Sequence, residues 1–482
     1  MNIQPESLEL LLRLAAGTLP DEALGQYRYG NLLDIKNLAA QMSTGGGISY
    51  VDLRQSLHQK IARRLVRLHR KIVVGIMGAS STAWIGDELY HLLDDSGIFE
   101  PYVFTLRART RPKEEADNQR EYDANVQDIR RRGLRLVENF NTRERREYTW
   151  DELPVHPDIC FWLSPWMWLW AGPLRVWNFP LTTLHTLIPY GYPGVTDRDR
   201  TFDKGYFDQE LHNLAWLIFL ESAASLPLAR HYCFSGDANC RYTGYPKMDP
   251  YFVPQQMEEE PSRWQPLLAA NGTPHAKKII YSPHHSLRKE DLITLSTFAD
   301  NGRWMLDLAR KYQKETVWVF KPHPQLGIKA IRYGLFKDQS EWEAYIAAWE
   351  ALPNATVQLT GGYHRLFQES DAIINDSASF MAEYLFVDKP MLELRRPEQA
   401  FDEFGQQVLD LLYQADGKDF SGIERFVQDV VLGGHDPKQP AREAFFRENL
   451  DYYHAMGGHT AAENIFTTFC TELYRDGGAD ES

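Results

Sequence analysis

The chain has 482 residues, with 52 Lys or Arg against 66 Asp or Glu, so its formal net charge is −14. Apolar residues make up 43% and charged residues 24%, which excludes collagen-like, disordered and disulfide-scaffold proteins. So acidic a chain also lacks the broad basic face of a non-specific nucleic-acid binder, and no nucleic-acid partner is expected. The length predicts two large domains with additional elements.

Cysteine usage and hydropathy bear on the compartment. The four cysteines are scattered and form no CxxC pair: Cys160, Cys233, Cys240 and Cys470. Such scattered thiols fit a reducing cytoplasm, and the first residues lack the basic region of a secretory signal. The most apolar stretch, Ile159 to Leu174, is too short to cross a bilayer and contains two prolines. We expect a cytoplasmic protein, with this Trp-rich stretch resting at the inner face of the membrane as the alternative interpretation.

Residues 1–70 predict a helical N-terminal extension. Leucines recur at helical spacing from Leu8 to Leu14, and a basic amphipathic segment runs from Leu57 to Arg70. Three glycines, Gly45 to Gly47, separate the two segments. We expect this extension to pack on a neighbouring domain or on a second subunit. In the second case the protein would be a homo-oligomer through residues 1–70.

From Lys71 the pattern changes to alternating strands and helices, which defines a first domain over residues 71–250. Its predicted strands are continuous apolar runs, at Ile72–Met77, Tyr102–Leu106, Leu134–Val137, Ile159–Leu163 and Tyr232–Ser235. A charged helix is expected over 111–132. Continuous apolar strands between helices are typical of a doubly wound parallel sheet.

Residues 251–275 read as a linker rich in proline and glutamate, after which the alternation restarts. A second domain over 251–435 has predicted strands at Ile279–Ser282, Val317–Phe320 and Ala372–Ile374, and helices are expected over 436–482. The predicted fold class is α/β and GT-B-like: two Rossmann-like doubly wound domains that face a cleft, with a helical N-terminal extension.

Polar residues follow all three strands of the second domain. The first strand leads to Ser282, His284 and His285, the second to Lys321 and His323, and the third to Asp376, Ser377 and Ser379. Because parallel strands end at the same edge of a sheet, these side chains are expected to meet, and ligands bind at that edge.

Two of these strand ends carry specific chemistry. Ser377 and Ser379 open a helix, whose free N–H groups suit a phosphate, although plain capping is the alternative. His323 lies between two prolines that stiffen its loop, which favours a positioned donor or acid/base group over a packed loop histidine.

No metal or other cofactor is expected. Adjacent histidines such as His284 and His285 rarely bind one ion together, and no carboxylate lies at ligand spacing. The segment Asp197-Arg-Asp199 is better explained as a solvated loop than as a metal site. The turn from Gly75 to Ser80 is not a GxGxxG dinucleotide motif, and its Gly78 and Ser80 are expected on the acceptor side.

Four segments together resemble the CDP-glycerol glycerophosphotransferase family, whose members include teichoic-acid polymerases and primases. They lie in order over residues 243–390: Thr243–Asp249, Tyr281–Pro283, Phe320–Pro324, and the run of Ser370–Ser379 followed by Tyr384–Pro390. The family's Tyr-Ser-Ser is here Ser377-Ala-Ser379, and its aromatic-Arg pair is replaced by His284-His285-Ser286 with Arg288 following. The family's first-half His-Gly-Thr-Pro has only an approximate counterpart around His185.

The resemblance implies transfer of an alditol-phosphate group from a CDP-activated donor to a hydroxyl of a glycan or lipid-linked acceptor. The donor would lie on the second domain, against the three strand ends and Arg288. The acceptor would enter from the first domain, near Tyr190, with His185 as general base and His323 stabilising the transferred phosphoryl group. Two alternatives stay open: a GT-B glycosyltransferase that uses a UDP- or CMP-linked sugar, and a non-catalytic component of a polysaccharide-assembly complex.

Overall fold

The computed structural model describes residues 3–41, 49–78, 84–107, 115–196, 206–257, 260–288, 291 and 293–478. The chain folds into two compact units. Unit 1 comprises Met1–Gly191, Lys204–Lys247 and Tyr452–Ser482, and unit 2 comprises Tyr192–Asp203 and Met248–Asp451. The predicted C-terminal helical segment is therefore divided between the units, because its last part returns to unit 1.

Unit 1 contains a parallel sheet whose described strands follow the order β3-β2-β1-β6-β7-β8-β9. The strands are β1 (Ile72–Met77), β2 (Phe99–Thr105), β3 (Leu136–Glu138), β6 (Ile159–Trp162), β7 (Leu184–Leu187), β8 (Leu217–Leu220) and β9 (Cys240–Tyr242), beside a small hairpin of β4 (Phe140–Asn141) and β5 (Arg146–Glu147). The first six strands of this sheet have the order 3-2-1-4-5-6 of a doubly wound Rossmann sheet. The strand predicted at 232–235 is wrong: residue 232 ends a helix, and β9 closes the sheet instead.

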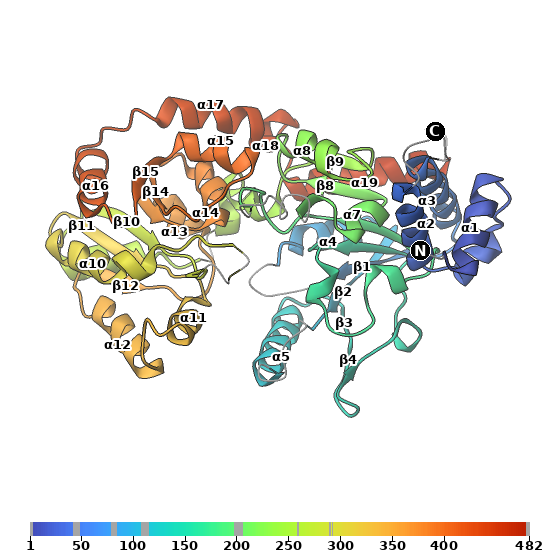
Figure 1. Cartoon of the computed structure of the whole chain (residues 1–482), viewed down its shortest axis with the longest axis horizontal. Coiled ribbons are helices and arrows are strands. Elements are labelled where there is room, and N and C mark those ends of the chain that lie inside the picture. Colours follow the sequence, from blue (N-terminus) through green and yellow to red (C-terminus); the bar gives the residue numbers. More distant parts are fainter. Residues whose placement is uncertain are drawn as a thin grey trace. The chain divides into compact units, whose positions relative to one another are not determined.

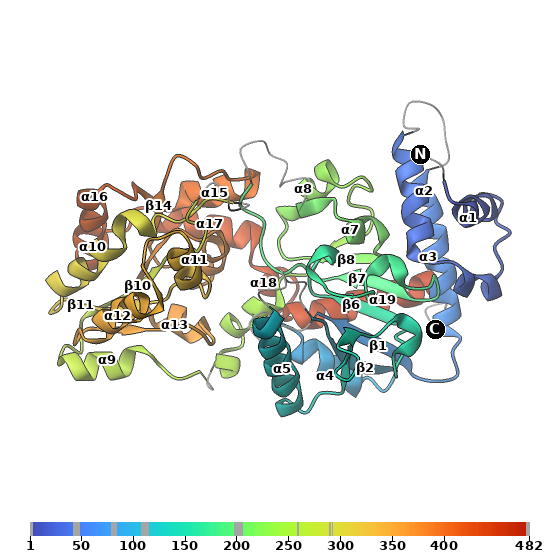
Figure 2. The ribbon, with the colours of Figure 1, turned by 60° about the horizontal axis from the view of Figure 1, so that its bottom comes forward.

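The N-terminal extension is part of unit 1, where its helices pack on the first predicted domain. The helices of unit 1 are α1 (Pro5–Ala15), α2 (Tyr29–Gln41), α3 (Tyr50–Val66), α4 (Asp87–Asp95), α5 (Glu115–Arg131), α7 (Glu210–Leu214), α8 (Ser225–Tyr232), α18 (Tyr452–Ala455) and α19 (Ala461–Gly477). The returning α19 packs along α3 (Figures 1 and 2). Tyr29 donates to the carbonyl of Thr183 at 2.7 Å, which ties α2 to the start of β7.

A glycine makes the return of the chain possible. Gly244 has a φ of +90°, and a Cβ built there would lie 2.2 Å from the ring of Tyr452, at the start of α18. Only glycine accepts both the conformation and the close approach. The glycine of the segment 243–249 therefore has a structural role, in the packing of the C-terminal helices on unit 1.

Unit 2 contains a second parallel sheet, in the order β12-β11-β10-β13-β14-β15. Its strands are β10 (Lys277–Ser282), β11 (Thr316–Phe320), β12 (Ala355–Val357), β13 (Ala372–Asn375), β14 (Met391–Arg395) and β15 (Tyr413–Asp416). The three predicted strands are confirmed as β10, β11 and β13. The other three are short or carry charged residues, and their apolar signal is correspondingly weak.

Helices cover the second sheet, and part of the predicted linker belongs to them. They are α9 (Trp264–Asn271), α10 (Phe298–Lys311), α11 (Leu326–Arg332), α12 (Gln339–Glu350), α13 (His364–Glu369), α14 (Ala378–Glu383), α15 (Glu403–Leu411), α16 (Phe420–Arg425) and α17 (Gln439–Asn449). Trp264 in the predicted linker is 1% exposed, and its indole donates to the carbonyl of Leu366.

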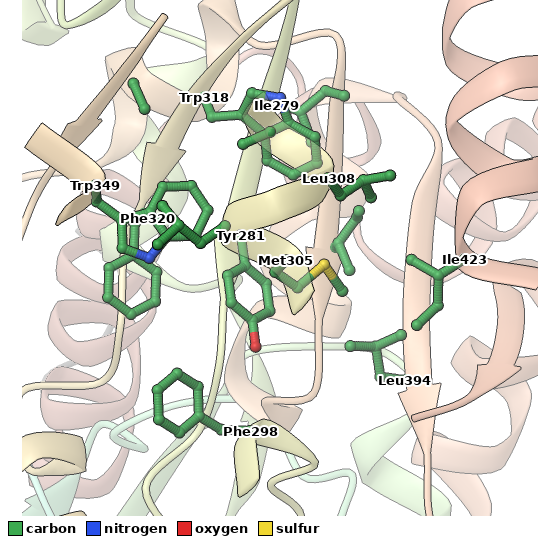
Figure 3. Close-up of a cluster of buried hydrophobic side chains, with 14 of the residues drawn as sticks. Ile279, Tyr281, Phe298, Met305, Leu308, Trp318, Phe320, Trp349, Leu394 and Ile423 are labelled. Carbon is green, nitrogen blue, oxygen red and sulfur yellow. The ribbon is translucent and has the colours of Figure 1, made fainter. Parts of the chain in front are cut away.

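A cluster of aromatic side chains lies in the core of unit 2 (Figure 3). Tyr281 and Phe320 lie on neighbouring strands and face the same side of the sheet. Trp349 of α12 stacks on Phe320 with a centroid distance of 5.1 Å, and Phe298 of α10 packs on the same ring. This rigid aromatic layer lies directly below the ends of β10 and β11 and holds those ends in place.

Candidate active site

The strand order of unit 2 reverses between β10 and β13, which is where doubly wound sheets bind ligands, beyond the carboxyl ends of their strands. Ser282 of β10 pairs in register with Asn375 of β13, and Tyr281 pairs with Phe320 of β11. The three strand ends singled out in the sequence are therefore neighbours, as predicted.

Hydrogen bonds join the loops that follow β10 and β11. The backbone N–H of Lys321 donates to the carbonyl of Tyr281 at 2.8 Å, and that of His323 donates to the carbonyl of Pro283 at 3.0 Å. The hydroxyl of Ser282, which is buried, donates to the carbonyl of Lys321 at 2.9 Å. Ser282 is therefore a positioning residue, which corrects its prediction as a phosphate contact.

Asp376 is also a positioning residue and not a ligand contact. It is fully buried, and its carboxylate accepts the backbone N–H of His284 at 2.5 Å and both the N–H and the hydroxyl of Thr297 at 2.6 and 2.8 Å. Burial raises the pKa of Asp376 to about 6, although these donors oppose the shift. The side chain fixes the His284 loop and the start of α10 to the end of β13.

Three imidazoles meet beyond these strand ends. The ring centroid of His285 lies 4.2 Å from that of His284 and 4.1 Å from that of His323. Burial, reinforced by the charges of neighbouring lysines, lowers the pKa of His323 to about 4, and burial together with His323 lowers that of His285 to about 3. Burial also holds the pKa of His284 well below its ordinary value. All three rings are therefore neutral at pH 7.

Backbone donors favour one tautomer for two of these rings. Nδ1 of His284 lies 2.7 Å from the Ser286 hydroxyl and accepts the N–H of Ser286 at 3.2 Å, and the N–H of Gln325 donates to Nδ1 of His323 at 3.1 Å. A neutral imidazole that accepts at Nδ1 carries its proton at Nε2. His284 and His323 therefore each offer one N–H donor, which suits the oxygen atoms of a phosphate.

The same cluster has the spacing of a metal site, since one ring nitrogen from each of His284, His285 and His323 lies within 4.8 Å of the others. A metal ligand needs a free lone pair, however, and in His284 and His323 that lone pair faces a backbone N–H. These tautomers favour an anion over a cation.

Ser377 is placed at the N-cap of α14 by a buried pair of side chains. The Asn375 amide donates to the carbonyl of Ser377 at 2.7 Å and to the Glu393 carboxyl at 2.9 Å. The Ser377 hydroxyl makes no capping bond, so the capping alternative does not describe it, and Ser379 lies exposed in the first turn. Because α14 has only six residues, we assign the anion-binding role to the side chains and not to the helix dipole.

Asn375 and Glu393 were missed in the sequence. Glu393 is fully buried, and burial raises the pKa of its carboxyl group well above the ordinary value. The available signal was an acidic residue between two leucines, Leu392 and Leu394.

The two basic residues assigned to the donor differ in their surroundings. Lys321 is 8% exposed, and its ammonium lies 5.5 Å from the centre of the Tyr363 ring. It lowers the pKa of His323, so its charge reaches the imidazole cluster. Arg288 is directed to Tyr333: it donates to that carbonyl at 2.7 Å and stacks on the ring at 4.8 Å. The structure therefore places Lys321, and not Arg288, at the cluster.

His185 is buried in the core of unit 1, which contradicts its prediction as a general base. It is the second residue of β7 and is 0% exposed. Its Nδ1 accepts the indole N–H of Trp162 at 3.0 Å, and burial lowers its pKa to about 3. With no free lone pair and no exposure, it cannot take a proton from a substrate hydroxyl.

The acceptor-side predictions have mixed outcomes. A Cβ on Gly78 would lie 2.9 Å from the Trp170 ring, so Gly78 makes room for that indole and not for a substrate. Ser80 lies outside the described residues, as does Asp197-Arg-Asp199. Tyr190 is 48% exposed, beyond the end of β7.

A pocket in unit 1 lies at the opposite edge of its sheet. It is lined by Arg54 and His58 of α3, by Trp216 and Asn239 before the starts of β8 and β9, and by Glu472 of α19. Ligands of doubly wound sheets bind at the carboxyl ends of the strands, so we do not assign this pocket to the reaction.

Residues 206–419 match the family model of the CDP-Glycerol:Poly(glycerophosphate) glycerophosphotransferases. The match includes every donor-side residue discussed above. It confirms the resemblance indicated by the sequence motifs and the expectation of a transferase. No curated protein matches the chain.

Solved structures show the same fold. A variant of the wall teichoic acid polymerase TagF is 12% identical, with a TM-score of 0.50 over 98% of this chain and 99% of that one. The UDP-bound MnaA of S. aureus is 13% identical, with a TM-score of 0.50 over 83% and 97%. A UDP-N-acetylglucosamine 2-epimerase homologue of Listeria monocytogenes is 14% identical, with a TM-score of 0.52 over 85% and 98%. These likenesses confirm the GT-B-like fold class. No helix in the described part of the chain is long and apolar enough to span a membrane.

Proposed function

We propose that the protein transfers an alditol-phosphate group from a CDP-activated donor to a hydroxyl of a glycan or lipid-linked acceptor. The product would be a teichoic-acid-type or capsule polymer. One observation carries the proposal: two neutral imidazoles with protons at Nε2, His284 and His323, meet at the switch point of unit 2, within the region that matches the family. Ser377 and Lys321 complete a small set of donors around them.

The donor set fits the charge that develops in such a transfer. The acceptor oxygen forms a bond to the distal phosphorus, the bond from that phosphorus to the bridging oxygen breaks, and CMP leaves with the electron pair. The acceptor proton passes to solvent or to a base. Phosphoryl transfer depends mainly on positioning and on stabilising the equatorial oxygens. The Nε2–H groups of His284 and His323 would hold these oxygens, and the Ser377 hydroxyl would hold the diphosphate.

Neutral donors also explain how an acidic protein binds a phosphate compound. The chain carries a net charge of −14, so a long-range positive field is absent. Fixed N–H dipoles in a partly buried site stabilise an anion without such a field, because they need no reorganisation when charge develops. Lys321 adds a positive charge next to them, and Lys329, which is paired with Asp291, also lowers the pKa values of these rings.

We further propose that transfer needs no metal ion at the three imidazoles, since the lone pairs of His284 and His323 are already occupied. Turnover by protein dialysed against EDTA should equal turnover in added Mg²⁺ or Zn²⁺. Loss of activity in EDTA with recovery by one metal would contradict this proposal.

The test of the function is the nucleotide that is released. We expect CDP-glycerol or CDP-ribitol to raise the Tm of the protein and to yield CMP when an acceptor is present. Release of a nucleoside diphosphate from UDP-sugars alone would establish a glycosyltransferase instead. If no nucleotide in the panel binds, a non-catalytic role in polysaccharide assembly would be the better account.

A further inference from the structure

An exposed group of aromatic side chains lies beyond the ends of two neighbouring strands of unit 1. Trp168 is 54% exposed and Tyr190 is 48% exposed. Trp166 lies between them, with centroid distances of 6.5 Å to Trp168 and 5.5 Å to Tyr190, and Tyr206 lies 6.2 Å from Trp166. We call these four residues the aromatic platform. Single exposed aromatic residues are common on protein surfaces, whereas a contiguous group of them is typical of a binding site.

The platform lies where a ligand is expected. Trp166 and Trp168 follow β6, and Tyr190 follows β7. The strand order of unit 1 reverses between β1 and β6, so the loop after β6 begins at the switch point of this sheet. At the carboxyl ends of its strands unit 1 therefore carries aromatic rings, whereas the sheet of unit 2 carries imidazoles and hydroxyls at the carboxyl ends of its own strands.

The platform is held in place by its own loops. Met167, between the two tryptophans, is fully buried, and Trp170 packs on Gly78 at the end of β1. The hydroxyl of Tyr206 donates to the carbonyl of Gly191 at 2.6 Å, and that of Tyr245 donates to the carbonyl of Tyr190 at 2.5 Å. A surface fixed before binding loses little conformational entropy when a ligand arrives.

Charge distinguishes the candidate ligands. From residue 163 to residue 191 the one Lys, Arg, Asp or Glu is Arg175, and its guanidinium donates to the carbonyl of Trp170. Binding to an anionic membrane depends on several Lys or Arg side chains near the surface. This segment supplies one, and residues 197–208 around Tyr206 carry three Lys or Arg against four Asp, which gives no net positive charge. An uncharged ligand with a flat apolar face fits it better.

We propose that the aromatic platform binds a sugar ring of the acceptor by stacking, and that it selects a glycan over a linear polyol phosphate. This inference rests on the proposed function for the identity of the acceptor. A pyranose has an apolar face of C–H groups and an edge of hydroxyls, which matches aromatic walls that carry a few polar atoms. A linear polyol phosphate offers no such face.

The experiment measures binding of methyl pyranosides, with and without an N-acetylamino group, by saturation-transfer NMR. We expect at least one glycoside to bind and Trp168→Ala to weaken it about tenfold, the scale of one lost stacking contact. Trp168→Phe should keep most of the affinity. Tyr474→Ala, which changes a residue of α19 that is 37% exposed, is the matched control and should bind normally.

Three results would contradict the proposed sugar binding. No glycoside binds, glycosides bind Trp168→Ala as well as the wild type, or the binding of glycerol 3-phosphate depends on Trp168 to the same degree. If vesicles of phosphatidylcholine and phosphatidylglycerol bind the wild type but not Trp168→Ala, the ligand of the platform is a lipid and not a sugar. CDP-glycerol should raise the Tm of every variant equally. If CDP-glycerol raises the Tm of no variant, the proposed function is wrong. Glycoside binding still tests whether the platform binds a sugar.

Discussion

The two sheets repeat one strand order but differ in what stands at their carboxyl edges. In unit 2 the switch point is surrounded by imidazoles, hydroxyls and one lysine, fixed by buried carboxyl groups. In unit 1 the corresponding edge carries exposed tryptophan and tyrosine rings. A common topology determines where ligands bind, whereas the side chains after each strand decide which chemistry they meet.

Two histidines, His185 and His323, show how the two units differ. His185 of unit 1 lies within a strand, so its ring is enclosed by Trp162, Tyr29 and Phe179 and belongs to the core. His323 of unit 2 lies three residues after a strand, where the backbone turns and the ring remains partly exposed. The same residue type therefore supports packing in one unit and a candidate reaction site in the other. The predictions below test that contrast.

The largest effect is expected at His323. Replacement by Ala removes one fixed donor, which in comparable sites lowers kcat about 100- to 1,000-fold. His323→Gln retains an N–H donor and should recover part of the rate. The measurement is CMP release at saturating donor, with the Tm as a control for folding. Near-normal turnover by His323→Ala would contradict its assigned role.

His185→Leu should change stability and not chemistry. The substitution leaves the buried indole N–H of Trp162 without its acceptor, which costs about 1–3 kcal/mol in the free energy of unfolding. Urea unfolding measures this loss, and kcat of the folded variant should match the wild type. A variant that is stable but inactive would support His185 as the general base and would contradict the difference in role between His185 and His323.

Ser377 and Ser282 form a matched pair within unit 2. Ser377→Ala should weaken donor binding about tenfold, because a hydrogen bond to a charged group is lost, while stability is retained. Ser282→Ala should lower stability by about 1 kcal/mol, because the carbonyl of Lys321 loses its donor, and donor affinity should change less. Isothermal titration with CDP-glycerol and urea unfolding separate the two. The reverse pattern would exchange their roles.

The smallest effect is expected from pH. Because the pKa of His323 is lowered from 6.5 to about 4, the C2-proton resonance of this ring should stay constant from pH 8 to 5. The unfolded chain takes up this proton at a higher pH than the folded chain, so the contribution of His323 to stability is present above pH 6.5 and is lost as pH falls toward 4. Asp376, with its pKa raised to about 6, acts in the opposite direction. A His323 titration midpoint near 6.5 would contradict the buried neutral ring.

The convergence of the three strand ends was predictable because continuous apolar runs mark buried parallel strands and such strands share one edge. Ser282 and Asp376 were placed correctly at that edge, but their roles were not. Whether a hydroxyl or carboxylate faces a ligand or the adjacent backbone depends on the neighbouring loop. Ser282 bonds the carbonyl of Lys321, and Asp376 bonds the N–H groups of His284 and Thr297. These partners are distant in sequence and become neighbours only in the fold.

The error at His185 has a similar origin. His185 was chosen because it lies near the expected position of the family's His-Gly-Thr-Pro, and β7 was not among the predicted strands. The neighbouring Trp162 and Tyr29 that enclose it come from β6 and from α2 of the N-terminal extension, which are distant in sequence. Glu393 shows the opposite case, since its position between Leu392 and Leu394 was a visible signal of a buried, hydrogen-bonded acid.

Sequence by itself determined the fold class, the location of the donor residues at three strand ends and the family resemblance, because these depend on local periodicity and on motif spacing. The tertiary structure alone decided which polar groups are free to bind, the tautomers of His284 and His323, and the division of the aromatic residues between core and platform. Each of these depends on which distant backbone or ring becomes a neighbour, and that information enters only when the chain is folded.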